Sequence, residues 1–411
     1  MGNLLQLCCP PEPEPNVQKT KEREIFRFFM VGTGAAGKTT VVRQLKCLCK
    51  EKPKSYKAYD KDWNQIPIEN IFTEQEMTQF RKVIRNNITN AVYNLIQQTT
   101  QWGHTHNAQE SAQRIIQTVE TAELEGWSSF NMNIPSTMGA DILAVLKEPS
   151  IADTLKVHDK MARKWHIEDG TLHFLCEEQI SRLFDDEAEL TTTDIVHSRY
   201  PTTDIQDFRF SISKMNIQIH DMGGQPTELV KLPEFINHWV AQDREGYKNF
   251  VLFVTSMADF NVPDEDEPSR TALERSIKIL EVTKKILNVD VVQSCGLLIF
   301  FNKQDRFDEI VTTLQATEEG RGEIEKFLGD TMKKDAKTKL NAGKCPVVTL
   351  HDALANKFDE VTKVKRKGAN EKGVYMRRVL KRKIDTITCS IIYSFIKCAD
   401  IKMSKSELCS V

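Results

Sequence analysis

A glycine-rich segment near the N-terminus carries the residue types that bind phosphate groups. It reads GTGAAGKT and matches the pattern GxxxxGK[ST] in full. In that pattern, backbone N–H groups surround the phosphates, Lys38 contacts the β and γ oxygens, and the Thr39 hydroxyl ligates Mg²⁺. The sequence therefore predicts a phosphate-binding loop made of Gly32, Thr33, Gly34, Ala35, Ala36, Gly37, Lys38, Thr39 and Thr40.

A second motif, NKQD, has the residue types that select a nucleotide base. It directly follows the apolar run 297–301. The Asp305 carboxylate can accept two hydrogen bonds from N1–H and the 2-amino group of guanine. Adenine lacks that donor pair, and leaving the carboxylate unpaired costs about 1–3 kcal/mol. Downstream of a phosphate-binding loop, NKQD favours GTP over ATP and predicts guanine contacts from Asn302, Lys303 and Asp305.

A third motif, DMGGQ, follows a strand-like run at residues 215–220. Asp221 at a strand end can hold Mg²⁺ through a water molecule. Gly223 and Gly224 allow the backbone to reach the γ-phosphate, and Gln225 would orient the attacking water. The alternative interpretation of this segment is a plain glycine turn.

These motifs need a sheet that brings strand ends together. EIFRFFMV, directly before the glycine-rich loop, predicts a buried strand, and helical sequence follows from Thr39. Residues from about 58 to 196 are mostly helical in pattern, with a capping box at residues 73–76 that begins a long amphipathic helix. Runs with strand character then alternate with helical segments, at residues 207–219, 249–254, 296–301 and 346–350. This alternation predicts a mainly parallel sheet with helices on both faces.

The composition excludes several classes of protein. The 411 residues carry a formal net charge of −2, so no basic excess argues for nucleic-acid binding. No apolar run approaches the roughly 20 residues that span a bilayer. The ten cysteines form no CxxC pair, and the proline-interrupted N-terminus does not resemble a secretory signal. We expect a protein of the reducing cytosol.

The three motifs, in this order, resemble those of the Ras-like GTPases. The helical block between Thr39 and Thr202 narrows the resemblance to the α subunits of heterotrimeric G proteins, which insert an all-helical domain at that point. The resemblance implies an α/β fold, a Ras-like P-loop GTPase domain with an inserted all-helical domain. It divides the chain into an N-terminal tail, the first part of the GTPase domain, the helical domain and the second part of the GTPase domain, at residues 1–23, 24–56, 57–196 and 197–411.

The resemblance also assigns roles near the end of the helical block. It makes Arg199 a built-in arginine that stabilises charge on the transferring phosphoryl group, although the residue type alone suggests a solvated side chain. Thr202 becomes a second hydroxyl ligand of Mg²⁺, ordered only with γ-phosphate present. Catalysis then falls to Arg199, Gln225 and Lys38, and metal binding to Thr39, Thr202 and, through water, Asp221. Residues 168–170 resemble a short acidic turn facing the nucleotide, and a solvated loop is equally consistent.

The family implies a GTP-hydrolysing switch that carries signals from membrane receptors to intracellular effectors. Its cofactor is Mg²⁺, it holds GTP or GDP, and it pairs with a βγ dimer at the cytoplasmic face of the plasma membrane. Gly2, Cys8 and Cys9 would supply the two lipid anchors that stable attachment to the inner leaflet needs. A disordered tail is the alternative for residues 1–9.

Several positions depart from the family. Its phosphate loop usually carries Glu-Ser, whose Glu pairs with an arginine of switch I, where this chain has Ala35-Ala36. The loss of that pair predicts somewhat faster release of GDP. Pro226 biases the Gln225 backbone toward an extended form, which predicts slow hydrolysis. Retention and loss of βγ docking are both consistent with these changes.

The C-terminal part departs as well. Only Thr349 matches the TCAT-like turn that the family places over guanine after its last strand. Residues 361–383 hold ten Lys and Arg and one acid, which suits either a solvated loop or an anionic leaflet. Two alternatives to a complete signalling GTPase stay open: a GTP-held interaction module with little hydrolysis, and a membrane GTPase that works without βγ.

Overall fold

The computed structural model describes residues 24–126, 131–199, 206–212, 215–224, 229–241, 246–264, 267–287, 295–362 and 374–378. The predicted lipidation, metal and water-positioning residues Gly2, Cys8, Cys9, Thr202 and Gln225 lie outside these ranges, as does Pro226. Among the described helices, none is long and apolar enough to cross a membrane.

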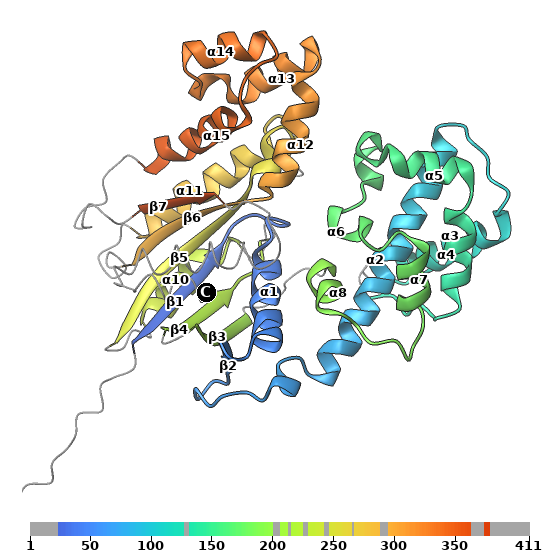
Figure 1. The fold of residues 1–411 in the computed structure, drawn as a ribbon, viewed down its shortest axis with the longest axis horizontal. Coiled ribbons are helices and arrows are strands. Elements are labelled where there is room, and N and C mark those ends of the chain that lie inside the picture. The colour runs from blue at the N-terminus through green and yellow to red at the C-terminus, as the bar shows by residue number, and fades with distance from the viewer. Residues whose placement is uncertain are drawn as a thin grey trace, which may run out of the picture.

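The larger of the two parts of the molecule is built on one seven-stranded sheet (Figure 1). Its order is β2-β3-β4-β1-β5-β6-β7, and the strands are β1 (Ile25–Val31), β2 (Tyr56–Tyr59), β3 (Gln206–Ile212), β4 (Met215–Asp221), β5 (Tyr247–Ser256), β6 (Gly296–Asn302) and β7 (Val374–Arg378). β1 runs parallel to β4 and β5, and β6 runs parallel to β5 and β7. Only β2–β3 and β3–β4 pair antiparallel. The prediction of a mainly parallel sheet is confirmed.

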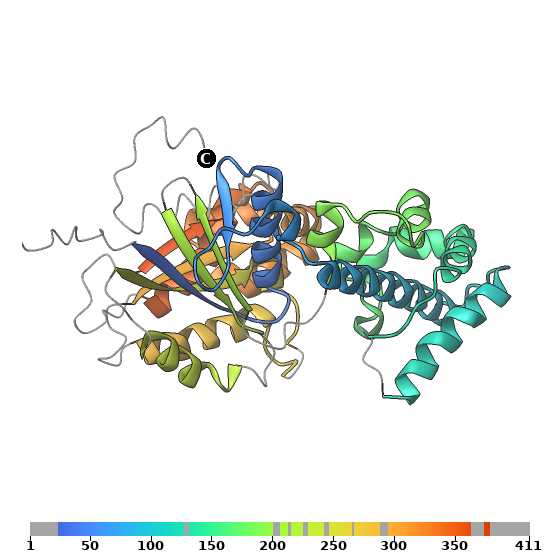
Figure 2. The same cartoon turned by 90° about the horizontal axis from the view of Figure 1, so that it is seen from below.

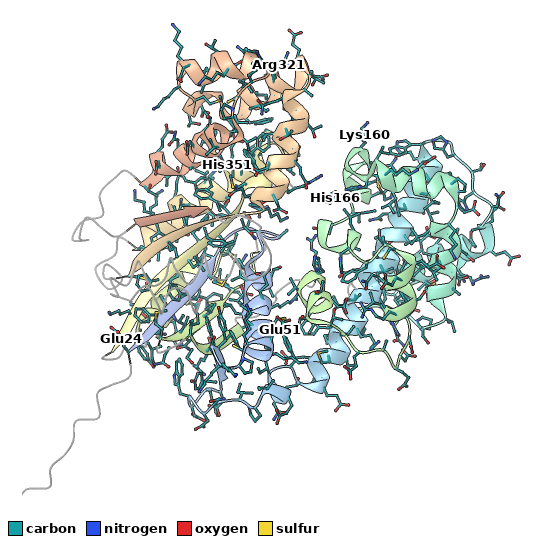
Figure 3. The ribbon with its side chains drawn as sticks, viewed as in Figure 1. Glu24, Glu51, Lys160, His166, Arg321 and His351 are labelled. Atoms are coloured by element: carbon teal, nitrogen blue, oxygen red, sulfur yellow. The ribbon has the colours of Figure 1, made fainter. Side chains whose placement is uncertain are left out.

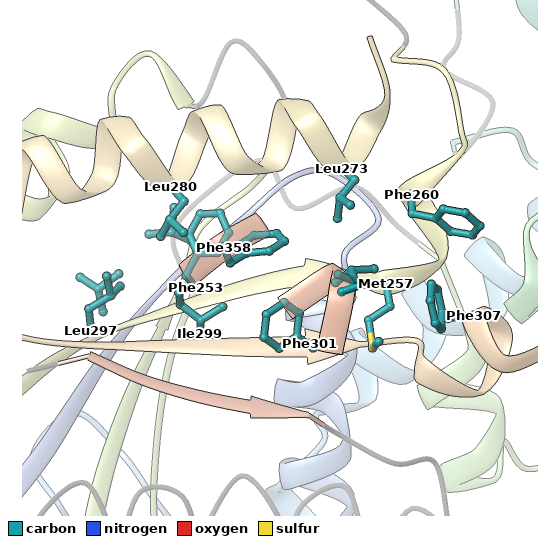
Figure 4. Close-up of a cluster of buried hydrophobic side chains, with 14 of the residues drawn as sticks. Phe253, Met257, Phe260, Leu273, Leu280, Leu297, Ile299, Phe301, Phe307 and Phe358 are labelled. Atoms are coloured by element: carbon teal, nitrogen blue, oxygen red, sulfur yellow. The ribbon is translucent and has the colours of Figure 1, made fainter. Parts of the chain in front are cut away.

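Central strand β1 shows why the sheet is covered on both faces. All seven of its residues are buried, as expected for a strand between two parallel neighbours. Phe26 and Phe28 pack in a cluster with residues of the first helix, whereas Phe29 packs in a second cluster with Trp239. Successive side chains of a strand point to opposite faces, so β1 belongs to both cores. Figure 4 shows the second cluster, in which side chains of β5 and β6 lie beneath the helix that carries Leu273 and Leu280.

The helices of this α/β part follow the strands in sequence. They are α1 (Lys38–Glu51), α10 (Leu232–Ala241), α11 (Ala272–Leu287), α12 (Gln304–Gln315), α13 (Glu318–Leu328), α14 (Lys334–Asn341) and α15 (Val347–Thr362). α1 supplies Val41 and Leu45 to the first cluster, and α10 and α11 supply the second. Figure 2 shows α1 on one face of the sheet, with α10 and α11 on the other.

A separate group of helices lies to the side of the sheet (Figure 1). Its members are α2 (Glu74–Gln101), α3 (Gln109–Leu124), α4 (Met138–Leu146), α5 (Pro149–Lys156), α6 (Asp169–Leu172), α7 (Glu177–Leu183) and α8 (Thr192–His197). The predicted capping box starts α2, with Thr73 and Glu76 exchanging both bonds. These helices enclose a third hydrophobic cluster of their own. Ile195 of α8 instead packs in the first cluster, with α1.

Three details differ from the sequence prediction. The segment 207–219 contributes to two antiparallel strands, β3 and β4, rather than to one strand. The edge strand β2 crosses the expected boundary between residues 56 and 57. Residues 346–350 are not a strand, because α15 begins at Val347 and buries Leu350, Leu354 and Phe358 at helical spacing. A five-residue apolar run could not distinguish the two.

The last difference corrects the match made at Thr349. That residue lies in the first turn of α15, so its assignment to the turn over guanine is wrong. The strand next to β6 is instead β7, within the basic segment 361–383. A loop that follows this last strand would therefore begin after Arg378, outside the described residues.

Candidate nucleotide site

The glycine-rich loop joins the end of β1 to the start of α1, as predicted. A Cβ atom at Gly32 would lie 2.0 Å from the carbonyl oxygen of Val254 in β5. Gly37 has φ +94°, and a Cβ atom there would lie 2.2 Å from Nδ2 of Asn302. Because real Cβ atoms do not approach so closely, both positions need glycine.

Lys38 is folded back over this loop. Its side chain is buried, and Nζ donates hydrogen bonds of 2.9 Å to the carbonyl oxygens of Gly32 and Thr33. The loop also contains Gly34, Ala35 at φ +57° and the buried Ala36, and Thr40 lies in the first turn of α1. α1 has no side-chain cap and no acidic residue in its first turn. Its first N–H groups and its helix dipole therefore favour an anion, and phosphate suits this position.

The Thr39 hydroxyl and the Asp221 carboxylate meet at the ends of α1 and β4. Thr39 Oγ1 donates a 2.6 Å hydrogen bond to Asp221 Oδ2. Asp221 is fully buried, and its Oδ1 atom has no hydrogen-bond partner among the described residues. Burial raises the pKa of Asp221, with Lys38 and Thr39 opposing the rise. A buried carboxylate oxygen without a partner, beside a hydroxyl, fits the oxygen ligands that Mg²⁺ prefers.

The glycines that follow β4 pass directly over the phosphate loop. A Cβ atom at Gly224 would lie 2.4 Å from Lys38 Nζ and 2.5 Å from the carbonyl carbon of Thr33. Gly223 is buried beside it. The structure therefore brings the first and third sequence motifs into contact.

The NKQD motif reaches the same loop from β6. Asn302 Nδ2 donates a 2.8 Å hydrogen bond to the carbonyl oxygen of Ala36. Lys303 takes the left-handed conformation, φ +55°, at the N-cap of α12, and Asp305 lies half-buried in the first turn of that helix. All three predicted motifs therefore lie at one end of the sheet.

Arg199 lies in the linker that leaves α8, and its surroundings were not predicted. Asn87 of α2 bonds both backbone groups of Arg199. The Arg199 N–H donates to Asn87 Oδ1 at 2.9 Å, and Asn87 Nδ2 donates to the Arg199 carbonyl at 3.1 Å. The guanidinium forms an ion pair with Glu168, which directly precedes α6. Figure 3 labels the neighbouring His166, on the side of the helical group nearest the sheet. The acidic turn therefore contacts the predicted arginine, and only a third of the Arg199 side chain is exposed (34%).

The linker is also bound from the other side, by α1. Arg43 Nη1 donates to the carbonyl oxygen of Ser198 and, at 3.2 Å, to its hydroxyl. Burial lowers the pKa of Arg43 to about 10, with Asp221 opposing the fall. Arg43 therefore keeps its charge at neutral pH.

Sequence reasoning missed Asn87 and Arg43. One signal was present for Asn87, which is a short polar residue in the middle of a long amphipathic helix. Such residues disfavour helix interiors unless a specific bond holds them. No pattern indicated Arg43, whose partner lies 155 positions away along the chain.

Comparison with known proteins agrees with these observations. Residues 11–371 match the family model described as G-protein alpha subunit. The guanine nucleotide-binding protein alpha-17 subunit of Caenorhabditis elegans is 23% identical over 361 residues, which cover 85% of this chain and 88% of the relative. The alpha-6 subunit of the same organism is 23% identical over 320 residues, which cover 77% of this chain and 76% of the relative. The G(o) subunit alpha of Planorbella trivolvis is 22% identical, with coverage of 72% of each chain.

Proposed function

Because the chain belongs to the G-protein alpha subunit family, it is a guanine nucleotide-binding signalling protein, and we propose that it hydrolyses GTP at this site. One observation carries the proposal. Lys38, Thr39, Asp221 and Gly224 converge within hydrogen-bond or van der Waals distance at the start of α1. That position has the N–H groups, cation and metal-type ligands that a nucleoside triphosphate requires.

The phosphates would occupy the space inside the glycine-rich loop. There Lys38 Nζ exchanges its bonds to the Gly32 and Thr33 carbonyls for phosphate oxygens, and the N–H groups at the start of α1 bind the same phosphates. Thr39 and Asp221, the latter through water, would hold Mg²⁺, which neutralises phosphate charge when bound. We propose Thr202 as a further hydroxyl ligand.

Hydrolysis is an in-line attack of water on the γ-phosphate. Gln225 orients the water, and the backbone of Gly223 and Gly224 lies next to Lys38, where the γ-phosphate belongs. Arg199 stabilises the charge that develops on the transferring group. Loss of the γ-phosphate then frees the segments that carry Thr202 and Gly224, which turns the switch off.

The base would lie against the N-terminal end of α12. Asp305 accepts two hydrogen bonds from guanine, and Lys303 borders the base. Asn302 joins this end of the site to the phosphate loop through Ala36. The chain would therefore bind GDP and GTP in preference to adenine nucleotides.

We place the protein at the cytoplasmic face of the plasma membrane, anchored through Gly2, Cys8 and Cys9. There it connects a membrane receptor to an effector and pairs with a βγ dimer.

We divide the chain into a tail, a GTPase domain and an inserted helical domain. The strand β2 (Tyr56–Tyr59) is assigned to the GTPase domain because it pairs with β3.

Single-turnover hydrolysis by the purified chain, beside Arg199→Ala, tests the proposal. We expect phosphate release from bound GTP, and a rate that is lower by at least about 10³-fold in the variant. That magnitude is the one documented for this arginine role in GTPases, the Gα family among them, and does not come from the contacts described above. Tight GTP binding without phosphate release in the native chain would instead support a GTP-held interaction module.

A further inference from the structure

The carboxylate of Glu168 contacts the cation that the proposed reaction needs. Glu168 belongs to the helical group, and its carboxylate pairs with the guanidinium of Arg199. Both side chains are about one-third exposed, at 36% and 34%. A γ-phosphate and this carboxylate would therefore compete for the same positive charge.

The backbone of Arg199 cannot resolve that competition by moving, because it is held on two sides. Asn87 bonds both its N–H and its carbonyl group. Arg43 bonds the carbonyl and hydroxyl of the preceding Ser198. The choice between carboxylate and phosphate is thus made by rotation of the Arg199 side chain alone.

The segment that carries Glu168 is packed closely on the end of α8, directly before the linker. A Cβ atom at Gly170 would lie 2.9 Å from the carbonyl oxygen of His197, so α6 contacts the backbone of the last residue of α8. The rings of His173 and His197 stack with centroids 4.3 Å apart and planes inclined by 21°. Buried Phe174 meets His197 edge-on at 6.3 Å. The carboxylate is therefore fixed beside Arg199 rather than carried on a loose loop.

The phosphate loop supplies no competing acid. Between Gly32 and Lys50 the sequence has no Asp or Glu, and Ala35 and Ala36 occupy the middle of the loop. The acidic partner described for Arg199 therefore comes from the helical group, across the linker from the phosphate site.

We propose that Glu168 is a positioning residue that holds the Arg199 side chain against the helical domain and thereby restrains GTP hydrolysis. This inference rests on the proposed hydrolysis. The growing negative charge of the transferring phosphoryl group draws Arg199 away, and the cost of breaking the ion pair is added to the barrier. A partly exposed pair is weak, so its removal accelerates hydrolysis by about two- to fivefold.

The test is single-turnover phosphate release by Glu168→Gln, which keeps the side-chain shape and removes the charge. We expect a rate about two- to fivefold above that of the native chain. Added salt, which screens the pair, should bring the native rate toward that of the variant. Glu177→Gln is the matched control, since it removes a carboxylate from an exposed pair with Lys147, at 2.7 Å, on the same domain. Its rate should stay native.

The same substitution in an Arg199→Ala background separates positioning from a general structural effect. There Glu168→Gln should change nothing, because the cation it holds is gone. An unchanged or slower rate for Glu168→Gln in a hydrolysing protein, or an equal acceleration without Arg199, overturns the inference and leaves the proposed function intact. Absence of phosphate release from the native chain and from Glu168→Gln overturns the inference and the proposed function together. Release from Glu168→Gln alone supports the inference in its strongest form.

Discussion

The phosphate loop and the linker that carries Arg199 are held by different kinds of contact. Lys38 bonds carbonyl groups five and six positions away, and its loop joins two consecutive elements, β1 and α1. Arg199 is held by Asn87, 112 positions away, and its neighbour Ser198 by Arg43, 155 positions away. One short stretch of sequence defines the first region, although Asn302 and Asp221 also bond to it from far along the chain. The second region has no such local definition, because its partners come from α2 and α1.

This difference implies a division of labour. Damage to the loop should weaken nucleotide binding whatever the state of the helical domain. Damage to the contacts of the linker should slow hydrolysis and leave binding nearly unchanged. Four substitutions test that separation.

A large effect on binding is expected from Gly37→Ala. Alanine at φ +94° is strained by about 1–3 kcal/mol, and its Cβ atom would also lie 2.2 Å from Asn302 Nδ2. Both costs act on the loop, so affinity for a non-hydrolysable GTP analogue should fall about tenfold to a hundredfold. The measurement is equilibrium fluorescence titration.

Gly103→Ala is the matched control. Gly103 has φ +80°, and a Cβ atom there meets nothing within 4 Å. It therefore carries the strain without the collision, and far from the nucleotide. Native affinity in Gly37→Ala, or the same loss in both variants, would show that the local geometry of the loop does not govern binding.

The next effect concerns the base. Asp305→Asn replaces an acceptor of two hydrogen bonds by a side chain that can donate one, so GDP affinity should fall about tenfold to a hundredfold. Xanthine has a carbonyl in place of the 2-amino group of guanine, so affinity for xanthosine diphosphate should rise. Competition binding measures both. Glu309→Gln, on the same helix and in an exposed pair with Arg306, should retain the native preference; a parallel loss there would count against base contact by Asp305.

The sequence predicted the local parts of this architecture well. A continuous apolar run before GxxxxGK[ST] predicted β1, the loop and α1, and NKQD and DMGGQ each lie where a strand ends. These motifs could be read because each is a contiguous stretch whose spacing reflects one strand–loop junction.

The parts that failed depend on distant partners or on patterns that are too short. The sequence around Glu168 suits a nucleotide-facing turn or a solvated loop, and only the folded chain shows its pairing with Arg199. Residues 346–350 suited a strand as well as a helix, until Leu354 and Phe358 extended the helical spacing. Asn87 left only a weak signal, because one polar residue in a helix does not indicate what it bonds.

Asn87→Ala should reveal the dependence on the helical domain. It removes both hydrogen bonds to the Arg199 backbone, each contributing about 0.5–1.5 kcal/mol, so the arginine is positioned less well and hydrolysis should slow about five- to tenfold. Nucleotide affinity should stay near native. Asn94→Ala, on the same helix, loses only a 3.3 Å bond to the His166 carbonyl and serves as control. A binding defect as large as the rate defect would refute the proposed separation.

The smallest effect on nucleotide binding and hydrolysis is expected from substitution of Asp194. Its bonds stabilise α8, the helix that ends directly before the linker. Its buried carboxylate bonds Arg182 twice, at 2.7 and 2.8 Å, and accepts the Thr191 N–H at 2.7 Å. Asp194→Asn keeps the shape and loses the charge, which should lower the free energy of unfolding by about 1–2 kcal/mol, a few degrees in Tm. Asp153→Asn, in an exposed pair with Lys156, should leave Tm unchanged.

The pH dependence of the Tm difference between the native chain and Asp194→Asn shows whether the charge of Asp194 causes it. Burial alone raises the pKa of Asp194, but the bonds from Arg182 and Thr191 outweigh burial and hold the pKa below its usual value. A carboxyl group whose pKa is lower in the folded than in the unfolded state stabilises the fold above its unfolded pKa, ~3.9, and loses that contribution as pH falls through the folded value. The gap in Tm between native chain and Asp194→Asn should thus be full from pH 7 to about pH 5 and shrink below about pH 4. A gap independent of pH would mean that Asp194 acts through shape and capping alone, and that the charge of Arg182 does not hold the helix leading to Arg199.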